Sequence, residues 1–199
     1  EHREKSDRLQ LLNGNWKFHY FESIYDVKES FYETDYDVSD FDEMRVPGIW
    51  QMEGYDMHQY TNIRYPFPFD PPYVPQDIPC GAYVHTFFYQ SEKTAPKAYL
   101  NFEGVDSCFY VWLNGKYVGY SQISHAVSEF DVTSFLKDGE NSIAVLVLKW
   151  CDGSYLEDQD KFRMSGIFRD VYILKRLERA VRDYRITTEA VSYTHLTLP

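Results

Sequence analysis

The sequence has few cysteines, no long apolar run and none of the common nucleotide or zinc motifs. Its three cysteines, Cys80, Cys108 and Cys151, are an odd number without CxxC spacing. This pattern argues against a disulfide framework and against a zinc site, and it fits a cytoplasmic protein with reduced thiols. No stretch has the length and apolarity of a transmembrane helix. The GxSxG, HExxH, P-loop and GxGxxG signatures are also missing.

Positive charge is scarce as well. The chain carries 31 acidic and 20 basic residues, which gives a net charge of −11 and a pI of about 4.9. An acidic surface repels phosphate groups, so a nucleic-acid partner is not expected. There is also no polybasic patch of the kind that binds membrane surfaces.

Aromatic residues, by contrast, make up 18% of the chain. Aromatic and β-branched side chains suit the pleated, half-buried surface of a sheet. Residues 15–20 alternate large aromatic with polar residues, which is the two-residue period of a strand. Further short strand signals lie at residues 44–46, 82–89, 97–102, 107–113, 117–121, 129–132, 142–148 and 171–174. Asn114-Gly115 predicts a hairpin turn. Because helical periodicity is almost absent, we predict an all-β jelly-roll β-sandwich with about seven or eight strands.

The proline-rich segment, residues 47–81, holds seven of the nine prolines together with many aromatic residues. Long aromatic loops in compact domains pack on a neighbour or serve function, so this segment is a candidate binding surface. Within it lies Asn62, whose amide can both donate to and accept from a pair of sugar hydroxyls. Its residue type alone equally fits a turn stabilised by local hydrogen bonds.

The acidic loop, residues 152–160, has four carboxylates within nine residues and follows an apolar strand. A carboxylate can accept two sugar hydroxyls or bind a cation through oxygen. A glycosidase acid/base pair must flank the scissile bond at a fixed separation, which one flexible loop does not provide. We therefore interpret this loop as a binding and orienting element, with a solvated acidic loop as the alternative.

Taken together, these motifs resemble the amino-terminal domain of β-galactosidases in glycoside hydrolase family 2. The run Ser154-Tyr155-Leu156-Glu157-Asp158-Gln159-Asp160 is the most specific of them. The other matching segments are residues 12–16, 46–47, 50–52, 54–56, 60–62, 71–75, 112–115, 118–120, 128–131, 139–141 and 163–170.

The resemblance implies a parent enzyme that hydrolyses terminal non-reducing β-D-galactosides such as lactose by a retaining mechanism. The catalytic glutamates would lie in a downstream (β/α)₈ barrel, so this chain alone should be inactive and hold no catalytic residue. By the same resemblance, Asn62 contacts the galactosyl unit, and Asp160 binds galactosyl hydroxyls and ligates Na⁺. Mg²⁺ would be held at the barrel by residues outside this chain. The full-length enzyme would be a homo-oligomer.

The expected organisation has four parts. Residues 1–9 are a frayed upstream segment, and residues 10–178 form the jelly-roll sugar-binding domain. Residues 179–189 contain a linker and, at 184–188, the first strand of a truncated immunoglobulin-like domain. Residues 190–199 read like a translated sequencing adapter rather than protein.

Two alternatives stay open. A jelly roll could also serve as a stand-alone carbohydrate-binding module, because fold does not fix function. The parent could instead be a β-glucuronidase or a β-mannosidase of the same family. The intact motifs at residues 60–62 and 154–160 favour a β-galactosidase.

Overall fold

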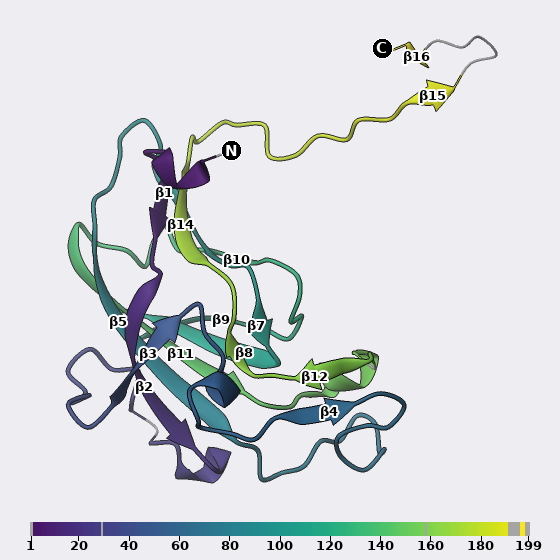
Figure 1. Ribbon diagram of the computed structural model, residues 1–199. Helices are drawn as coiled ribbons and strands as arrows, with labels where there is room; N and C mark the ends of the chain where they lie inside the picture. Colours follow the sequence, from purple (N-terminus) through teal and green to yellow (C-terminus); the bar gives the residue numbers. More distant parts are fainter. Residues whose placement is uncertain (1, 29, 158, 191–195, 198–199) are drawn as a thin grey trace.

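The computed structural model describes residues 2–28, 30–157, 159–190 and 196–197 and shows a sandwich built from β-strands (Figure 1). These described residues contain no α-helix. They have short 3-10 turns at Arg3–Lys5 (η1), Ile24–Asp26 (η2), Trp50–Met52 (η3) and Asp152–Leu156 (η4). Within the same ranges, no helix is long and apolar enough to cross a membrane.

Two antiparallel sheets make up the sandwich, which confirms the predicted all-β fold. The four-stranded sheet has the order β1 (Leu9–Leu11), β14 (Val171–Arg176), β6 (Lys97–Phe102) and β10 (Ser128–Asp131). The six-stranded sheet has the order β3 (Asp42–Val46), β2 (Gly14–Phe21), β5 (Cys80–Tyr89), β11 (Gly139–Leu148), β8 (Cys108–Leu113) and β9 (Lys116–Ser121).

Three short ribbons complete the set of paired strands. They are β4 (Gln59–Thr61) with β12 (Lys161–Arg163), β7 (Val105–Asp106) with β13 (Gly166–Ile167), and β15 (Glu189–Ala190) with β16 (Leu196–Thr197).

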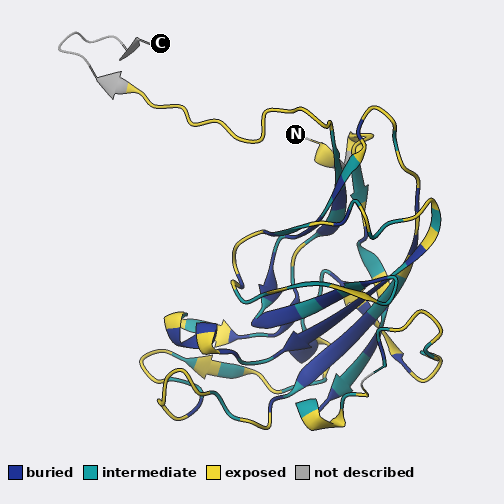
Figure 2. Ribbon diagram, turned by 180° about the vertical axis from the view of Figure 1, so that it is seen from behind, coloured by how far each residue is buried: buried dark blue, intermediate teal, exposed yellow. Residues whose placement is uncertain are grey.

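The six-stranded sheet is covered on both faces. On β11, Ile143, Val145 and Val147 belong to the cluster between the two sheets, whereas Leu146 and Leu148 belong to a second cluster on the outer face. The outer cluster also includes Phe31 and Phe41 from the segment between β2 and β3, and Ile78 from the segment just before β5. Figure 2 shows β11 and its neighbours as the most deeply buried part of the fold. The two covered faces explain why residues 142–148 read as a nearly continuous apolar run.

Aromatic side chains fill the inner core. Trp16, Phe18, Trp50 and Tyr83 are fully buried, and the Trp50 indole N–H donates to the Tyr83 hydroxyl at 2.6 Å. Gly81 permits this packing, because a Cβ there would lie 2.5 Å from a ring carbon of Phe18. Much of the aromatic content is thus core packing rather than exposed surface.

Most strand predictions agree with the structure. The strand at residues 97–102 has the predicted limits, and Asn114 and Gly115 adopt φ angles of 52° and 75° in the hairpin between β8 and β9. Strands β1, β4, β7, β12 and β13 were missed, because two or three residues are too few to show a period.

The two ends of the chain differ in their contacts. Arg3, in the segment expected to be frayed, forms ion pairs with Glu103 and Asp170 of the sandwich. Residues 184–188 are exposed and belong to no strand, so the predicted second-domain strand has no partner here. The boundaries at 178 and 190 stay predictions, and most of the adapter-like tail (191–195 and 198–199) lies outside the described residues.

The inner core generates a stability prediction. Ile143→Ala should lower the free energy of unfolding by about 2–5 kcal/mol, because it removes buried methyl groups and leaves a cavity. Ile123→Ala, at a loop position that is 64% exposed, is the matched control and should change stability little. Urea unfolding followed by circular dichroism measures both, and equal losses would contradict the assigned core.

Candidate functional site

The ribbon of β4 and β12 joins the proline-rich segment to the acidic loop. The two strands pair antiparallel with Lys161 opposite Thr61, and they lie side by side at one end of the sandwich (Figure 1). Asn62 and Asp160 are each the next residue beyond the same end of this ribbon. The structure therefore brings the two predicted binding residues together, although almost a hundred positions separate them in the sequence.

Tyr60 connects these two residues. Its hydroxyl donates a hydrogen bond to Asp160 Oδ1, and the Asn62 side chain lies near enough to act on the pKa of the Tyr60 hydroxyl. The bond to the carboxylate raises the pKa of the Tyr60 hydroxyl above its ordinary value, because it stabilises the protonated form. All three side chains are exposed. Together they form the polar patch, defined as Tyr60, Asn62 and Asp160, which offers an amide, a carboxylate and an aromatic ring to solvent.

Arg163 holds the ribbon against the acidic loop. Its guanidinium is almost fully buried and donates from Nε to Thr61 Oγ1 at 3.0 Å and from Nη1 to the carbonyl of Glu157 at 2.8 Å. Glu157 in turn accepts a hydrogen bond from Ser124 Oγ at 3.1 Å. Nη2 of Arg163 is buried without a hydrogen-bond partner. This arginine thus fixes β4 relative to the segment that leads to Asp160.

Two carboxylates lie close to Lys161, the first residue of β12. Lys161 Nζ is 3.7 Å from Asp106 Oδ2 and 3.8 Å from Glu157 Oε2. Burial raises the pKa of the Asp106 carboxyl from 3.8 to about 6, even though the charge of Lys161 acts in the opposite direction. Burial and Lys161 together lower the pKa of nearby His125.

These groups border a largely apolar cavity of about 330 Å³ next to β12. Its lining residues are Ile49, Asp106, His125, Lys161, Phe162, Met164 and Phe168. Tyr60, Asn62 and Asp160 are not among these lining residues, so the cavity and the polar patch are separate features of the surface.

Tyr155 fastens the proline-rich segment to the acidic loop. Its buried hydroxyl donates to the carbonyl of Tyr73 at 2.6 Å and accepts from the backbone N–H of Asp70 at 3.2 Å. The Tyr65 hydroxyl donates to the carbonyl of Tyr155 at 3.1 Å. The proline-rich segment is therefore packed on the domain, as predicted, and is not a solvated linker.

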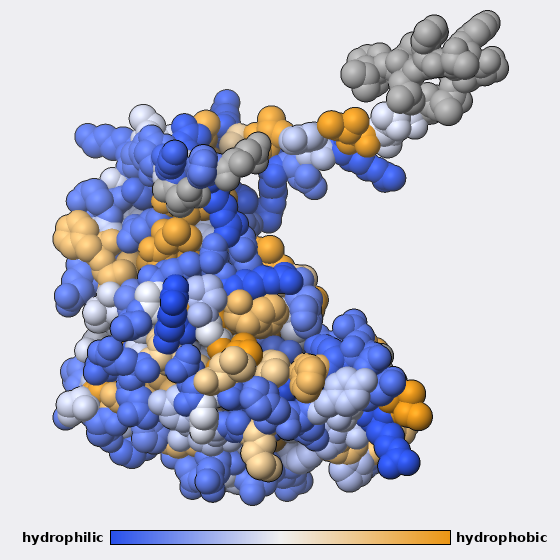
Figure 3. Space-filling view, in the orientation of Figure 1, coloured by the Kyte–Doolittle hydropathy of each residue, from blue (hydrophilic) through white to orange (hydrophobic). Residues whose placement is uncertain are grey.

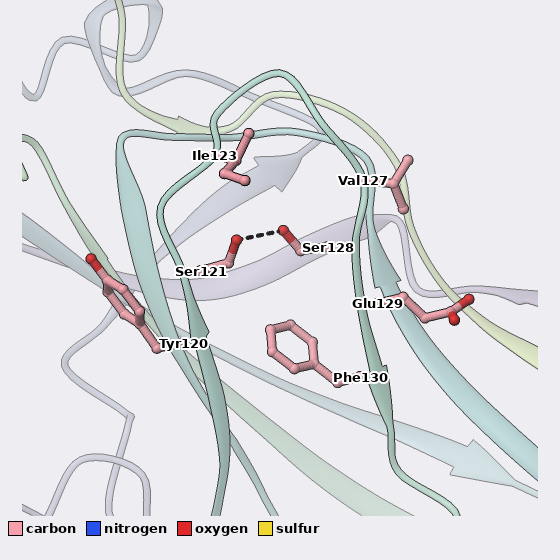
Figure 4. Close-up of a pocket in the computed structure, with 7 residues that line it drawn as sticks. All are labelled: Tyr120, Ser121, Ile123, Val127, Ser128, Glu129 and Phe130. Atoms are coloured by element: carbon pink, nitrogen blue, oxygen red, sulfur yellow. Dashed lines mark hydrogen bonds between the residues drawn. The ribbon is translucent and has the colours of Figure 1, made fainter. Parts of the chain in front are cut away.

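A second depression lies between β9 and β10 (Figure 4). It measures about 150 Å³, and the Ser121 and Ser128 hydroxyls hydrogen-bond across it at 2.8 Å. Its one carboxylate, Glu129, is engaged by Arg176 at 2.6 Å. Because its polar groups already satisfy one another, this depression is a weaker candidate than the polar patch.

The described residues contain no group of three or more His, Cys, Asp or Glu side chains that could hold a metal ion. Of the four carboxylates in the acidic loop, Asp158 lies outside the described residues. Asp160 is exposed and could supply one oxygen ligand to a cation.

Viewed in space-filling form, the surface is mostly hydrophilic, with a small group of apolar residues near the centre of the face shown in Figure 3.

Comparison with known proteins gives a consistent result. Residues 9–177 match the family described as "Glycosyl hydrolases family 2, sugar binding domain". The chain is 54% identical to a β-galactosidase of Actinobacillus pleuropneumoniae over 187 residues, which cover 94% of this chain and 18% of that protein. It is 52% identical to a β-galactosidase of Staphylococcus xylosus over 188 residues, with the same coverage of each. The chain thus spans about a fifth of the length of these relatives.

Among solved structures, the chain is similar to a β-glucuronidase from Ruminococcus gnavus with a TM-score of 0.67. The match covers 94% of this chain and 33% of that one, at 16% sequence identity. At that identity the likeness supports the fold alone.

The buried Asp106 generates a pH prediction. A carboxyl whose pKa is raised by folding favours the folded state at low pH and loses that contribution as the pH rises through about 6. Asp106→Asn does not titrate, so its stability relative to wild type should increase between pH 4.5 and 7.5. A rise in the Asp106 pKa from 3.8 to about 6 corresponds to about 3 kcal/mol of unfolding free energy, which is the upper value for this increase in relative stability. Chemical unfolding across this pH range measures the difference.

The control for this prediction is Asp138→Asn. Hydrogen bonds from Ser91 lower the pKa of Asp138, so its titration falls below the tested range. The difference between this variant and wild type should stay constant from pH 4.5 to 7.5. A constant difference for Asp106→Asn as well would contradict the buried, raised-pKa carboxyl.

Proposed function

The chain belongs to glycosyl hydrolases family 2 as a sugar binding domain, and on that basis we propose that it is the amino-terminal domain of a retaining β-galactosidase. The proposed substrates are terminal non-reducing β-D-galactosides such as lactose. Identities of 54% and 52% to two β-galactosidases support this choice within the family. The observation that carries the proposal is the polar patch, because it unites the two motifs that favour a β-galactosidase.

The polar patch contributes to galactose binding in this proposal. The Asn62 amide can donate to one sugar hydroxyl and accept from another, and the Asp160 carboxylate can accept from two. The hydrogen bond from Tyr60 engages Oδ1 of Asp160 and orients the carboxylate, whose Oδ2 would then serve a sugar hydroxyl or a cation. Charge-assisted hydrogen bonds of this kind are stronger than neutral ones, which suits recognition of a polar sugar in water.

A sodium ion belongs to the same proposal, with Asp160 as one of its ligands. Hard cations prefer oxygen ligands, and an exposed carboxylate fits that chemistry. The described part of this chain contains no group of three or more His, Cys, Asp or Glu side chains that would form a complete cage. We propose that the remaining sodium ligands, and all magnesium ligands at the catalytic centre, come from the rest of the parent protein.

Catalysis is assigned to the rest of the parent protein. A retaining glycosidase needs two carboxyl groups about 5–5.5 Å apart across the scissile bond, and we propose that two glutamates of a downstream barrel supply them. A homo-oligomeric parent and a cytoplasmic location are further parts of the proposal. The location is supported by the three cysteines, which are all free thiols.

A stand-alone carbohydrate-binding module is the second candidate function. The sandwich fold would allow it, because such modules need only a sugar-binding surface. The two candidates differ in where sugar affinity resides. A module binds galactose by itself, whereas a domain that supplies part of a site depends on its partner domain.

The isolated 199-residue chain should show no hydrolysis of a chromogenic β-galactoside, because we assign the catalytic carboxylates to another domain. The measurement is release of nitrophenol with and without Na⁺ and Mg²⁺, with a catalytically active β-galactosidase as the positive control. Turnover that co-purifies with the chain would contradict this assignment.

The polar patch can be tested in a chimera. Residues 9–177 of this chain would replace the matching segment of the Actinobacillus pleuropneumoniae β-galactosidase, with which the chain shares 54% identity. Asp160→Asn should raise KM by about 10-fold or more, since a hydrogen bond to a charged group contributes about 1.5–3 kcal/mol. Asn62→Ala should raise KM by about 2- to 10-fold, since a hydrogen bond between neutral groups contributes about 0.5–1.5 kcal/mol. Asp160→Asn should also raise the sodium concentration needed for half-maximal activity.

Asp77→Asn is the matched control, because Asp77 is an exposed carboxylate elsewhere in the proline-rich segment. It should leave KM and the sodium response unchanged. Equal changes for Asp77→Asn and Asp160→Asn would remove the support for Asp160 as a sugar and sodium ligand.

A further inference from the structure

Two of the three cysteines meet beneath the acidic loop. Cys108 begins β8 and lies opposite Leu148, the last residue of β11, while Cys151 follows Leu148 by three residues and precedes η4. The backbone N–H of Ser107 donates to the carbonyl of Leu148 at 3.2 Å, which holds these two segments together. Cys108 and Cys151 belong to the same buried cluster, and each is the largest influence on the pKa of the other, so the two thiols are neighbours.

Polar groups surround the Cys151 sulfur. Ser107 Oγ lies 3.2 Å from it, and Ser154 Oγ donates to it at 4.0 Å. Together with the Cys108 thiol and the Gly153 backbone, these groups lower the pKa of Cys151 to about 6. The interaction with Cys151 and burial raise the pKa of Cys108. At neutral pH this arrangement favours a Cys151 thiolate beside a protonated Cys108.

Cys80 provides an internal comparison. It lies opposite Leu148 from the other side, on β5, and is fully buried. Burial raises its pKa to about 12, and no thiol or hydroxyl contributes to that value. Cys151 is 7% exposed, more than Cys108 at 2% or Cys80 at 0%. The cysteine with the most thiolate character is therefore also the one most open to a small oxidant.

We propose that Cys108 and Cys151 are a redox modification site that closes to a reversible disulfide when a peroxide reaches Cys151. The Cys151 thiolate attacks one peroxide oxygen, the O–O bond breaks, and the other oxygen leaves as water after taking up a proton. The product is a sulfenic acid at Cys151. The Cys108 sulfur then attacks the Cys151 sulfur, its proton and the sulfenic hydroxyl leave as water, and the S–S bond forms. Two thiols and one peroxide thus give one disulfide and two waters.

The disulfide would act on the acidic loop. In the thiol form, Cys151 and Ser154 cap the short turn η4 together, because the Cys151 backbone N–H donates to Ser154 Oγ at 3.2 Å and the Ser154 hydroxyl donates to the Cys151 sulfur at 4.0 Å. Bonding to Cys108 would withdraw the sulfur from the cap and tie η4 to the start of β8. Because Asp160 follows η4 in the same loop, oxidation should change the protection of residues 152–160 against hydrogen exchange. The site itself does not depend on the proposed sugar-binding function.

The test uses the reduced 199-residue chain and hydrogen peroxide. Intact mass under non-reducing conditions should fall by two hydrogen atoms, and peptide mapping should find Cys108 joined to Cys151. Dithiothreitol should restore the original mass. With all thiols present, Cys151 should react at least about 10-fold faster than Cys80, as expected from its thiolate character. A crosslink that includes Cys80, or no loss of hydrogen, would overturn the proposal.

Cysteine variants distinguish the thiol that the peroxide oxidises first from the thiol that then attacks it. Cys108→Ala should leave a sulfenic acid on Cys151 that dimedone labels, whereas Cys151→Ala should leave Cys108 unlabelled. Cys80→Ala is the matched control and should close the disulfide like wild type. Near-UV circular dichroism checks that each variant is folded. If a variant does not fold, the peptide map of the oxidised wild-type chain decides the question. Equal dimedone labelling of Cys108→Ala and Cys151→Ala would overturn the assignment of Cys151 as the first thiol to react.

Discussion

The pairing of β11 with β5 and β8 is the constraint on which the rest of the structure depends. Strand β11 lies between these two neighbours in the six-stranded sheet, and its side chains from Ile143 to Leu148 are buried on one face or the other. A shift of one residue would exchange the two hydrophobic clusters, so only one register is compatible with both. The acidic loop leaves the end of β11, and this register therefore fixes where η4 starts and in which direction it leads to Asp160.

From that starting point, buried polar contacts set the position of the ribbon. Arg163 bonds to Thr61 and to the backbone of Glu157, and Lys161 lies between the carboxylates of Asp106 and Glu157. Buried charges are costly unless they are paired, which makes alternative placements of the ribbon unfavourable. Burial raises the pKa of Asp106 against the opposing charge of Lys161, so the same group of side chains that positions the ribbon also gives the domain a response to pH.

Much of the sandwich could be predicted from the sequence because its long strands carry a periodic pattern. Residues 97–102 alternate clearly, and Asn114-Gly115 is the dipeptide that a tight hairpin requires. The ribbon of β4 and β12 could not be predicted in this way. Each strand has three residues, and their pairing depends on Arg163 and Tyr155, whose contacts come from distant parts of the chain.

The sequence by itself determined the fold class, the family resemblance and the identity of Asn62 and Asp160 as candidates, since these rest on local periodicity and contiguous motifs. Only the tertiary structure decided that the two side chains share one patch, that Tyr60 connects them, and that Cys108 meets Cys151. The physical reason is distance along the chain. Contacts between segments separated by forty to a hundred residues arise from sheet register and core packing, which no local pattern records.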